Sequence, residues 1–180
     1  MKFCSECGHT VSEKIPDGDN RPRFVCDQCG VIHYQNPKIV TGCIAQWEDK
    51  VLLCQRAIEP RHGLWTLPAG FMENHESAEE GAKRETWEEA CANVTLEALY
   101  ALYSIPHISQ VYLLYRCRLD NLDFKPGPES LDVKLFSKAD IPWDNLAFPV
   151  VHKTLTRFFL DQQTQDYALH VGTLHPAKPA

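Results

Sequence analysis

Three glutamates in one short segment form the strongest candidate for chemistry. Glu85, Glu88 and Glu89 are spaced i, i+3 and i+4, so on a helix they share one face with Cβ atoms about 5–6 Å apart. A solvated acidic face is the simpler alternative, but these carboxylates lie toward the C-terminal end of the expected helix, where the helix dipole disfavours anions. A hard divalent cation such as Mg²⁺ or Mn²⁺ would relieve the repulsion and keep positions open for substrate phosphates. The spacing therefore favours metal-dependent activation of water for attack on a phosphate.

A second candidate site is made of cysteines. Four of the eight cysteines form two CxxC pairs, Cys4-x2-Cys7 and Cys26-x2-Cys29. The 18 residues between the pairs fit a four-cysteine zinc site, and Gly8 and Gly30 can take the positive φ that such turns need. Two disulfides or a redox motif are the alternatives, but a redox motif is expected as one pair near a βαβ unit. We interpret the pairs as a structural zinc site, because four protein ligands leave no position for water.

A zinc ribbon could also bind nucleic acid, and this is our second interpretation of the N-terminal segment. Residues 1–36 carry four Lys or Arg and five Asp or Glu, so the ribbon lacks a basic stripe. The whole chain has a net charge of −6, which gives no electrostatic footprint for a nucleic-acid backbone or an anionic membrane. We therefore expect no nucleic-acid partner and no membrane association.

Composition limits the architecture that must position these residues. The 180 residues allow one ordinary domain plus a small appendage, and the 44% apolar and 23% charged content is typical of globular chains. No stretch is apolar for the 18 or more residues of a membrane span, and Met1-Lys2-Phe3-Cys4 leads into a polar segment instead of a signal peptide. We expect a soluble cytoplasmic protein. A homodimer is one possible oligomeric state.

The periodicity predicts alternating strands and helices after a change of composition near residue 36. Ser77 and Glu80 fit a capping box that begins a helix extending to about Ala90. Residues 60–67 are expected to be a loop. The remaining predicted elements are a hairpin of residues 38–47 and 51–54, strands at 96–104, 111–119 and 132–136, and a C-terminal helix at 150–160. We therefore divide the chain into a zinc ribbon, 1–36, and a mixed α/β domain, 37–180.

Residues 70–92 resemble the Nudix box, G-x5-E-x7-R-E-U-x-E-E-x-G-U, in which U is a bulky aliphatic residue. The glycine and every charged position of that pattern are present, as Gly70, Glu76, Arg84, Glu85, Glu88 and Glu89. Thr86 and Ala92 replace aliphatic residues, and Cys91 stands where glycine usually ends the helix. Because cysteine adopts positive φ less readily than glycine, we expect a changed helix end without loss of chemistry.

The resemblance implies a fold, a reaction and a set of roles. The fold is a Nudix α/β/α sandwich with a mixed sheet, here preceded by the small β zinc ribbon. The reaction is hydrolysis of a nucleoside diphosphate linked to another moiety, and the three glutamates at the end of the box bind Mg²⁺ or Mn²⁺. The residue matching Arg84 orients a neighbouring glutamate, and the one matching Glu76 supports the set or binds a further ion. The carbonyl matching that of Gly70 lies near the metal.

Segments outside the box resemble the plant FAD pyrophosphatases of the Nudix family over nearly the whole chain. They are Ile15–Gly18, Tyr34–Lys38, His62–Phe71, Gly127–Leu131 and Leu146–Phe148. NADH pyrophosphatases share the zinc ribbon but have an S-Q-P-W-P-F-P-x-S signature, whereas this chain reads Ser104-Ile-Pro-His-Ile-Ser-Gln110 after the box. The resemblance therefore favours cleavage of FAD into FMN and AMP over other nucleoside diphosphate derivatives such as NADH, ADP-ribose or CoA.

Two residues outside the box complete the candidate site. Glu129 is either a general base, a substrate contact or a surface loop acid, and Trp65 either stacks on a substrate ring or packs against the core. In the resulting hypothesis water attacks one phosphorus and Glu89 or Glu129 takes its proton. The alternative is a regulatory or nucleic-acid-binding zinc-ribbon protein with an idle Nudix domain, which the intact charged box disfavours.

Overall fold

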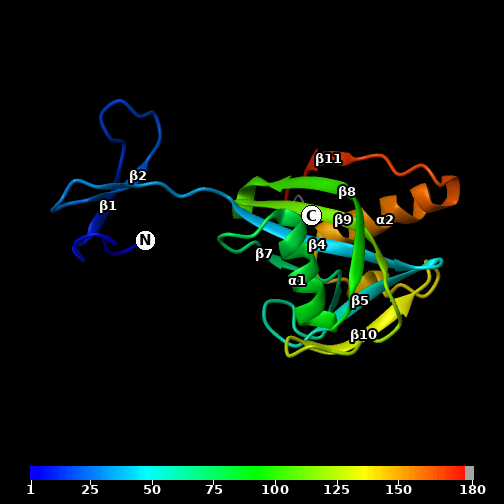
Figure 1. The fold of residues 1–180 in the computed structure, drawn as a ribbon. Coiled ribbons are helices and arrows are strands. Elements are labelled where there is room, and N and C mark those ends of the chain that lie inside the picture. The colour runs from blue at the N-terminus through cyan, green and yellow to red at the C-terminus, as the bar shows by residue number, and fades with distance from the viewer. Residues whose placement is uncertain (177–180) are drawn as a thin grey trace. The chain divides into compact units, whose positions relative to one another are not determined.

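The N-terminal unit is a small antiparallel sheet. The computed structural model describes residues 1–176, and the chain divides into two compact units, Met1–Pro37 and the segment from Lys38 onward. In the first unit, of which Figure 1 labels two strands, the central strand pairs antiparallel with each of the other two. Its strands are β1 (Val11–Lys14), β2 (Arg23–Cys26) and β3 (Ile32–His33). The expected small β unit at the N-terminus is therefore confirmed.

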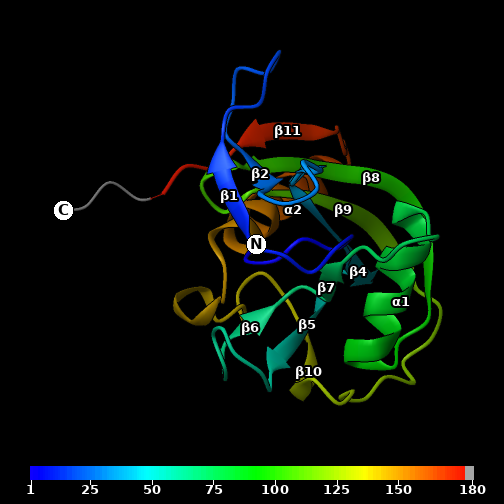
Figure 2. The same ribbon diagram turned by 90° about the vertical axis from the view of Figure 1, so that its left-hand side faces the viewer.

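The second unit is built on an eight-stranded mixed sheet. Six strands run in the order β10-β5-β4-β9-β8-β11, while β6 pairs with β5 and β7 pairs with β4. The strands are β4 (Lys38–Trp47), β5 (Lys50–Arg56), β6 (Trp65–Thr66), β7 (Ala69–Phe71), β8 (Val94–Ile105), β9 (Gln110–Leu119), β10 (Ser130–Phe136) and β11 (His170–Thr173). The helices α1 (Ala78–Ala90) and α2 (Pro149–Thr164) cover opposite faces of the sheet (Figure 2). This is the expected α/β/α sandwich.

Alternating side chains of the central strands create two cores. Ile44 of β4 and Leu53 of β5 pack on the α2 side, in a cluster that includes Leu155 and Phe158. Their neighbours point to the other face, where they pack with α1 residues such as Ala82. A strand buried on both faces reads as a continuous apolar run, which explains the sequence of β4 and β5.

The predicted β4–β5 hairpin is confirmed, but β11 was not predicted. The hairpin is antiparallel, with Gln46 opposite Val51. The four residues of β11 pair in parallel with β8, so that His170 lies opposite Ala101. Such a short segment has too little periodicity to be recognised, and the strand with which it pairs is far away in the sequence.

Helix α1 begins as predicted but ends differently. The Ser77 side chain accepts a hydrogen bond from the Glu80 amide (3.2 Å), and the Glu80 carboxylate accepts one from the Ser77 amide (2.7 Å). At the other end Cys91 adopts φ 48°, and its amide donates to the Trp87 carbonyl at 2.8 Å. The expectation of a changed helix end is therefore wrong, because the cysteine takes the left-handed conformation that glycine normally supplies.

One further element corrects the sequence analysis. Residues 60–67 are not entirely loop, since β6 pairs Thr66 with Cys54 and Trp65 with Gln55 of β5. Two residues of strand supported by tertiary pairing carry no sequence signal of their own. No helix in residues 1–176 is long and apolar enough to cross a membrane.

Candidate active site and zinc site

The four cysteines of the N-terminal unit converge on one point. Their ligand atoms all lie within 4.8 Å of one another, and the closest Sγ–Sγ distances are 3.4, 3.5 and 3.7 Å. A tetrahedral zinc site with Zn–S bonds of about 2.3 Å needs sulfur atoms about 3.8 Å apart. Gly8 and Gly30, which follow the two pairs, both have φ of +74°. This geometry fits one zinc ion.

In the metal-free cluster the surroundings favour the thiolate of Cys26, whereas the pKa values of Cys7 and Cys29 are raised by hydrogen bonds with neighbouring thiols. The amide of Cys29 lies 3.4 Å from Cys26 Sγ, and this backbone donor helps to lower the pKa of Cys26 to about 6. His33 Nε2 lies 3.3 Å from Cys4 Sγ, close enough to donate a hydrogen bond to a zinc-bound thiolate. Donors to the sulfur atoms offset part of the negative charge that four thiolates bring to one ion.

In the second unit, Glu89 is the most deeply buried of the glutamates in the box. It is only 7% exposed, and its Oε2 accepts a hydrogen bond from the Ala69 amide at 3.1 Å. Burial raises the pKa of Glu89 to about 8, because desolvation disfavours the charged form more than the Ala69 amide stabilises it. A carboxylate held in this way has no structural benefit from being charged, so it is suited to binding a cation.

Arg84 gathers the other carboxylates of the box. Its Nε and Nη2 donate to the two oxygens of Glu76 (2.9 and 2.8 Å), and its Nη1 donates to Glu85 (2.7 Å) and Glu88 (2.9 Å). This two-point hydrogen bond, with help from the Glu73 amide, lowers the pKa of Glu76 to about 2. Arg84 therefore binds both oxygens of Glu76 but shares the single nitrogen Nη1 between Glu85 and Glu88, which leaves negative charge for a cation.

Gly70 allows the backbone to approach this cluster. A Cβ atom at this position would lie 2.3–2.4 Å from the carboxylate atoms of Glu85. Burial raises the pKa of that carboxyl group, although the hydrogen bond and charge of Arg84 oppose the shift. Any side chain at residue 70 would displace Glu85, so the structure explains why glycine occupies the first position of the box.

The loop before β10 is docked on the C-terminal end of α1. The amides of Lys125 and Gly127 donate to the carbonyls of Ala90 (2.9 Å) and Glu89 (3.0 Å), which the helix cannot satisfy internally. A Cβ at Gly127 would lie 1.7 Å from the Glu88 carbonyl oxygen, so only glycine permits this approach. The docking brings Glu129 near the box, where its charge raises the pKa of Glu89.

Glu129 and Trp65 have different environments. Glu129 is exposed, and within residues 1–176 its carboxylate has neither a hydrogen-bond nor an ion-pair partner. The Trp65 ring packs edge-on against Phe136, with centroids 4.9 Å apart, and lies 5.7 Å from the Lys134 ammonium group. The structure thus brings Glu129 toward the glutamates and gives Trp65 a packing contact.

Sequence reasoning missed Arg56 and the role of Gly127. The positive charge of Arg56 opposes the raised pKa of Glu89, so its guanidinium lies within electrostatic reach of the cluster. The same group lies 5.3 Å from the centroid of the Phe148 ring and forms no ion pair with a carboxylate in the described part of the chain. An arginine at the end of a buried strand was the only sequence signal for this placement.

The carboxylates are suited to a hard divalent cation but are gathered less tightly than the cysteines. Among residues 1–176, only the four cysteines meet the 4.8 Å condition given above. Even so, Glu85 and Glu89 are both partly or fully buried, and the pKa of each is raised. Carboxylate oxygens with uncompensated charge are the ligands that Mg²⁺ and Mn²⁺ prefer.

Two family models match different parts of the chain. The family model described as Nudix N-terminal, a zinc ribbon, matches residues 2–35, and the NUDIX domain model matches residues 36–158. A crystal structure of a NUDIX hydrolase from Nitrosomonas europaea is 56% identical, with a TM-score of 0.94. That alignment covers 97% of this chain and 99% of the other.

Two curated relatives are more distant. The NAD-capped RNA hydrolase NudC of Photobacterium profundum is 29% identical over 144 residues, which are 77% of this chain and 50% of the relative, so the chain spans about half the length of that protein. The ADP-ribose pyrophosphatase of Methanocaldococcus jannaschii is 28% identical over 123 residues, 64% of this chain and 69% of the relative. The NUDIX domain model matches more than half of this chain, and the chain therefore belongs to the NUDIX family.

Proposed function

We propose that the protein is a divalent-cation-dependent pyrophosphohydrolase that acts on dinucleotides and splits FAD into FMN and AMP. The observation that supports it most is the burial of Glu89 at a pKa of about 8 beside the backbone of Ala69 and Gly70, within a cluster of further carboxylates. The charged form of such a group is costly to the fold unless a cation binds it. The match to an ADP-ribose pyrophosphatase and the sequence resemblance to FAD pyrophosphatases support a pyrophosphate substrate.

In this proposal Glu85, Glu88, Glu89 and the Gly70 carbonyl would hold Mg²⁺ or Mn²⁺, with Glu76 supporting the set through Arg84. When bound, such an ion stabilises charge on the phosphate oxygens and lowers the pKa of a coordinated water. Water adds to one phosphorus of FAD, the bridging P–O bond breaks, and FMN and AMP leave. The four cysteines would hold a structural zinc ion outside this reaction.

Glu129 is our choice of general base. The Ala69 amide holds the carboxylate of Glu89, whereas that of Glu129 is exposed and free to accept the proton of the attacking water. We expect Glu129→Gln to lower kcat by about 100-fold while metal binding is retained. Unchanged kcat in this variant would indicate that Glu89, and not Glu129, is the general base.

The experiment that tests the substrate compares FAD and NADH under one set of Mg²⁺ conditions, with the products resolved by chromatography. Both substrates contain ADP, so the metal site alone would treat them alike and discrimination must come from contacts outside the box. We expect kcat/KM for FAD to be well above that for NADH. A ratio in favour of NADH, or activity on nucleoside triphosphates alone, would contradict the FAD assignment.

A second candidate function is hydrolysis of NAD or of an NAD-capped RNA end. It is favoured by the match to the NAD-capped RNA hydrolase of Photobacterium profundum over 77% of this chain. Including NAD-capped RNA in the same assay distinguishes the two candidates. The net charge of −6 supports a small substrate, because RNA binding relies on neutralising phosphates with basic residues.

A further inference from the structure

The cysteine cluster of the N-terminal unit contains two exposed and two buried side chains. Cys7 and Cys29 are exposed, whereas Cys4 is only 4% and Cys26 only 2% exposed. Each CxxC pair therefore contributes one sulfur atom that solvent reaches and one that it does not. A bound zinc ion would hold all four as thiolates, the form that reacts with oxidants, so access decides which of them a small oxidant meets first.

The two exposed sulfur atoms are also neighbours. Cys7 Sγ lies 3.5 Å from Cys29 Sγ, although the residues are 22 positions apart in the sequence and belong to different CxxC pairs. A disulfide requires the two sulfur atoms to close to about 2.05 Å. When one of the two is oxidised, the other can therefore reach it by a small movement of exposed side chains.

The two buried sulfur atoms are held in place by nitrogen atoms. Cys4 Sγ lies 3.4 Å from the Glu6 amide and 3.3 Å from His33 Nε2. Cys26 Sγ lies 3.4 Å from the Cys29 amide. A hydrogen bond to a thiolate withdraws charge from the sulfur and makes it a weaker nucleophile. We therefore expect the exposed sulfur atoms to react before the buried ones.

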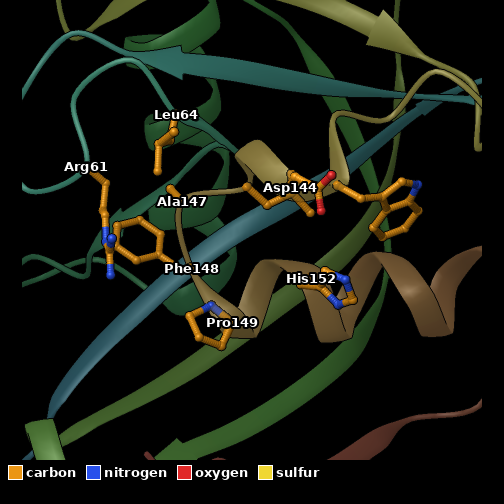
Figure 3. A pocket seen from close by; sticks show the side chains of 9 residues that line it. Arg61, Leu64, Asp144, Ala147, Phe148, Pro149 and His152 are labelled. Carbon is orange, nitrogen blue, oxygen red and sulfur yellow. The ribbon is translucent and has the colours of Figure 1, made fainter. Parts of the chain in front are cut away.

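The cysteines of the second unit offer no exposed pair within the described residues. Cys43, Cys54 and Cys117 are buried, and Cys91 at the end of α1 is partly exposed. A cavity of about 420 Å³ opens beside the start of α2, but no described residue that lines it is a cysteine, as Figure 3 shows. A small oxidant is therefore expected to act first on the N-terminal unit.

We infer that Cys7 and Cys29 form a modification site at which hydrogen peroxide joins their sulfur atoms in a disulfide and displaces zinc. One thiolate takes an oxygen atom from peroxide and becomes a sulfenic acid, and hydroxide leaves. The other thiolate attacks this sulfur, the S–O bond breaks and a second hydroxide leaves. Two protons from solvent convert the hydroxides into water, so two thiolates, one peroxide and two protons give one disulfide and two waters.

The disulfide would remove two of the four ligands of the zinc site. Two remaining thiolates do not complete the tetrahedral set of a structural zinc ion. Because the binding energy of such an ion is folding energy, the N-terminal unit would also lose stability. The inference goes beyond the hydrolysis proposed above, but it rests on the zinc ion proposed for these cysteines.

The test treats zinc-loaded wild-type protein with one equivalent of hydrogen peroxide per chain. A chromogenic dye measures released zinc, and mass spectrometry maps the disulfides after free thiols are alkylated. Cleavage after Glu6 and before Asp27 separates the two cysteines of each pair, so the bonded sulfur atoms are identified unambiguously. We expect about one zinc ion released for each Cys7–Cys29 disulfide, and a reductant with added Zn²⁺ should restore the metal content.

A variant that keeps a zinc ligand but lacks one thiol provides the second test. Cys29→His can still complete a tetrahedral site, so the reduced variant should hold zinc. Under the same peroxide treatment it should release zinc at least about 5-fold more slowly, because the second exposed thiolate is gone. The matched control is Cys91→Ser, which removes a partly exposed thiol outside the cluster and should release zinc at the wild-type rate.

Several outcomes would overturn the inference. They are retention of zinc after oxidation, release of zinc without a disulfide, a disulfide that maps to another pair, and release from Cys29→His at the wild-type rate. If Cys29→His does not hold zinc, the disulfide map of the wild type still decides. Metal analysis before oxidation tests the zinc site itself, because reduced protein without zinc would contradict both the site and the inference.

Discussion

Replacing Glu89 by glutamine should stabilise the metal-free protein while it abolishes most activity. In the fold without a cation the pKa of Glu89 rises from 4.5 to about 8. The unfolded chain therefore releases this proton at lower pH than the folded chain does. Because the folded state binds more protons between these values, stability falls as the pH rises from 4.5 to 8.

The size of the effect follows from the same two values. Each unit by which the pKa of Glu89 differs between the unfolded and the folded chain corresponds to about 1.4 kcal/mol. Ionising Glu89 therefore costs the metal-free fold on the order of 4 kcal/mol at pH 8. Glutamine keeps an oxygen that can accept the Ala69 amide but carries no charge. For a chain of this length the melting temperature should rise on the order of 10 °C at pH 8, with little change near pH 4.5.

The assay is thermal unfolding of zinc-loaded protein from pH 5 to pH 9, desalted into buffer without other divalent ions so that the zinc site stays intact. Glu88→Gln is the matched control, because its side chain is 55% exposed and its ion pair with Arg84 is worth less than about 1 kcal/mol. Adding Mg²⁺ should stabilise the wild type more than Glu89→Gln, and both variants should lose about 100-fold or more in kcat.

The reasoning is refuted if Glu89→Gln melts at or below the wild-type temperature at pH 8. It is equally refuted if the difference between the two proteins does not grow with pH. Wild-type turnover in both variants at saturating Mg²⁺ would remove these glutamates from the metal site.

Three further predictions concern other parts of the chain. Freshly purified, reduced protein should contain one zinc per chain, and Cys4→Ser or a chelator should remove it and expose the N-terminal unit to protease, as metal analysis and limited digestion will show. Gly127→Ala should push the loop off α1, cost about 1–3 kcal/mol and lower kcat through Glu129, whereas the exposed neighbour Pro126→Ala should leave kcat unchanged. Cys91→Gly should raise the free energy of unfolding by about 1 kcal/mol in urea denaturation, because φ 48° costs glycine nothing, and a lower value would contradict the assigned strain.

Local features of the fold were predictable from the sequence. The capping box of Ser77 and Glu80 and the β4–β5 hairpin depend on interactions between residues a few positions apart. The separation of the two CxxC pairs likewise predicted the cysteine cluster, because each CxxC turn brings its own two sulfur atoms together. The spacing of Glu85, Glu88 and Glu89 placed them on one helical segment, which α1 confirms.

Interactions between distant segments could be decided only by the tertiary structure. Glu89 owes its raised pKa to burial, which outweighs the hydrogen bond from the Ala69 amide, and nothing in the spacing of the glutamates distinguishes it from the exposed Glu88. Cys91 adopts the left-handed conformation although cysteine takes positive φ less readily than glycine, because tertiary packing can override such a local preference. Gly127 lies in the loop before β10 and Arg56 at the end of β5, and both reach the site through tertiary contacts. Contacts between such distant segments produce no periodic pattern in the sequence. Desolvation and close packing depend on everything around a residue, so they are properties of the folded molecule and not of the local sequence.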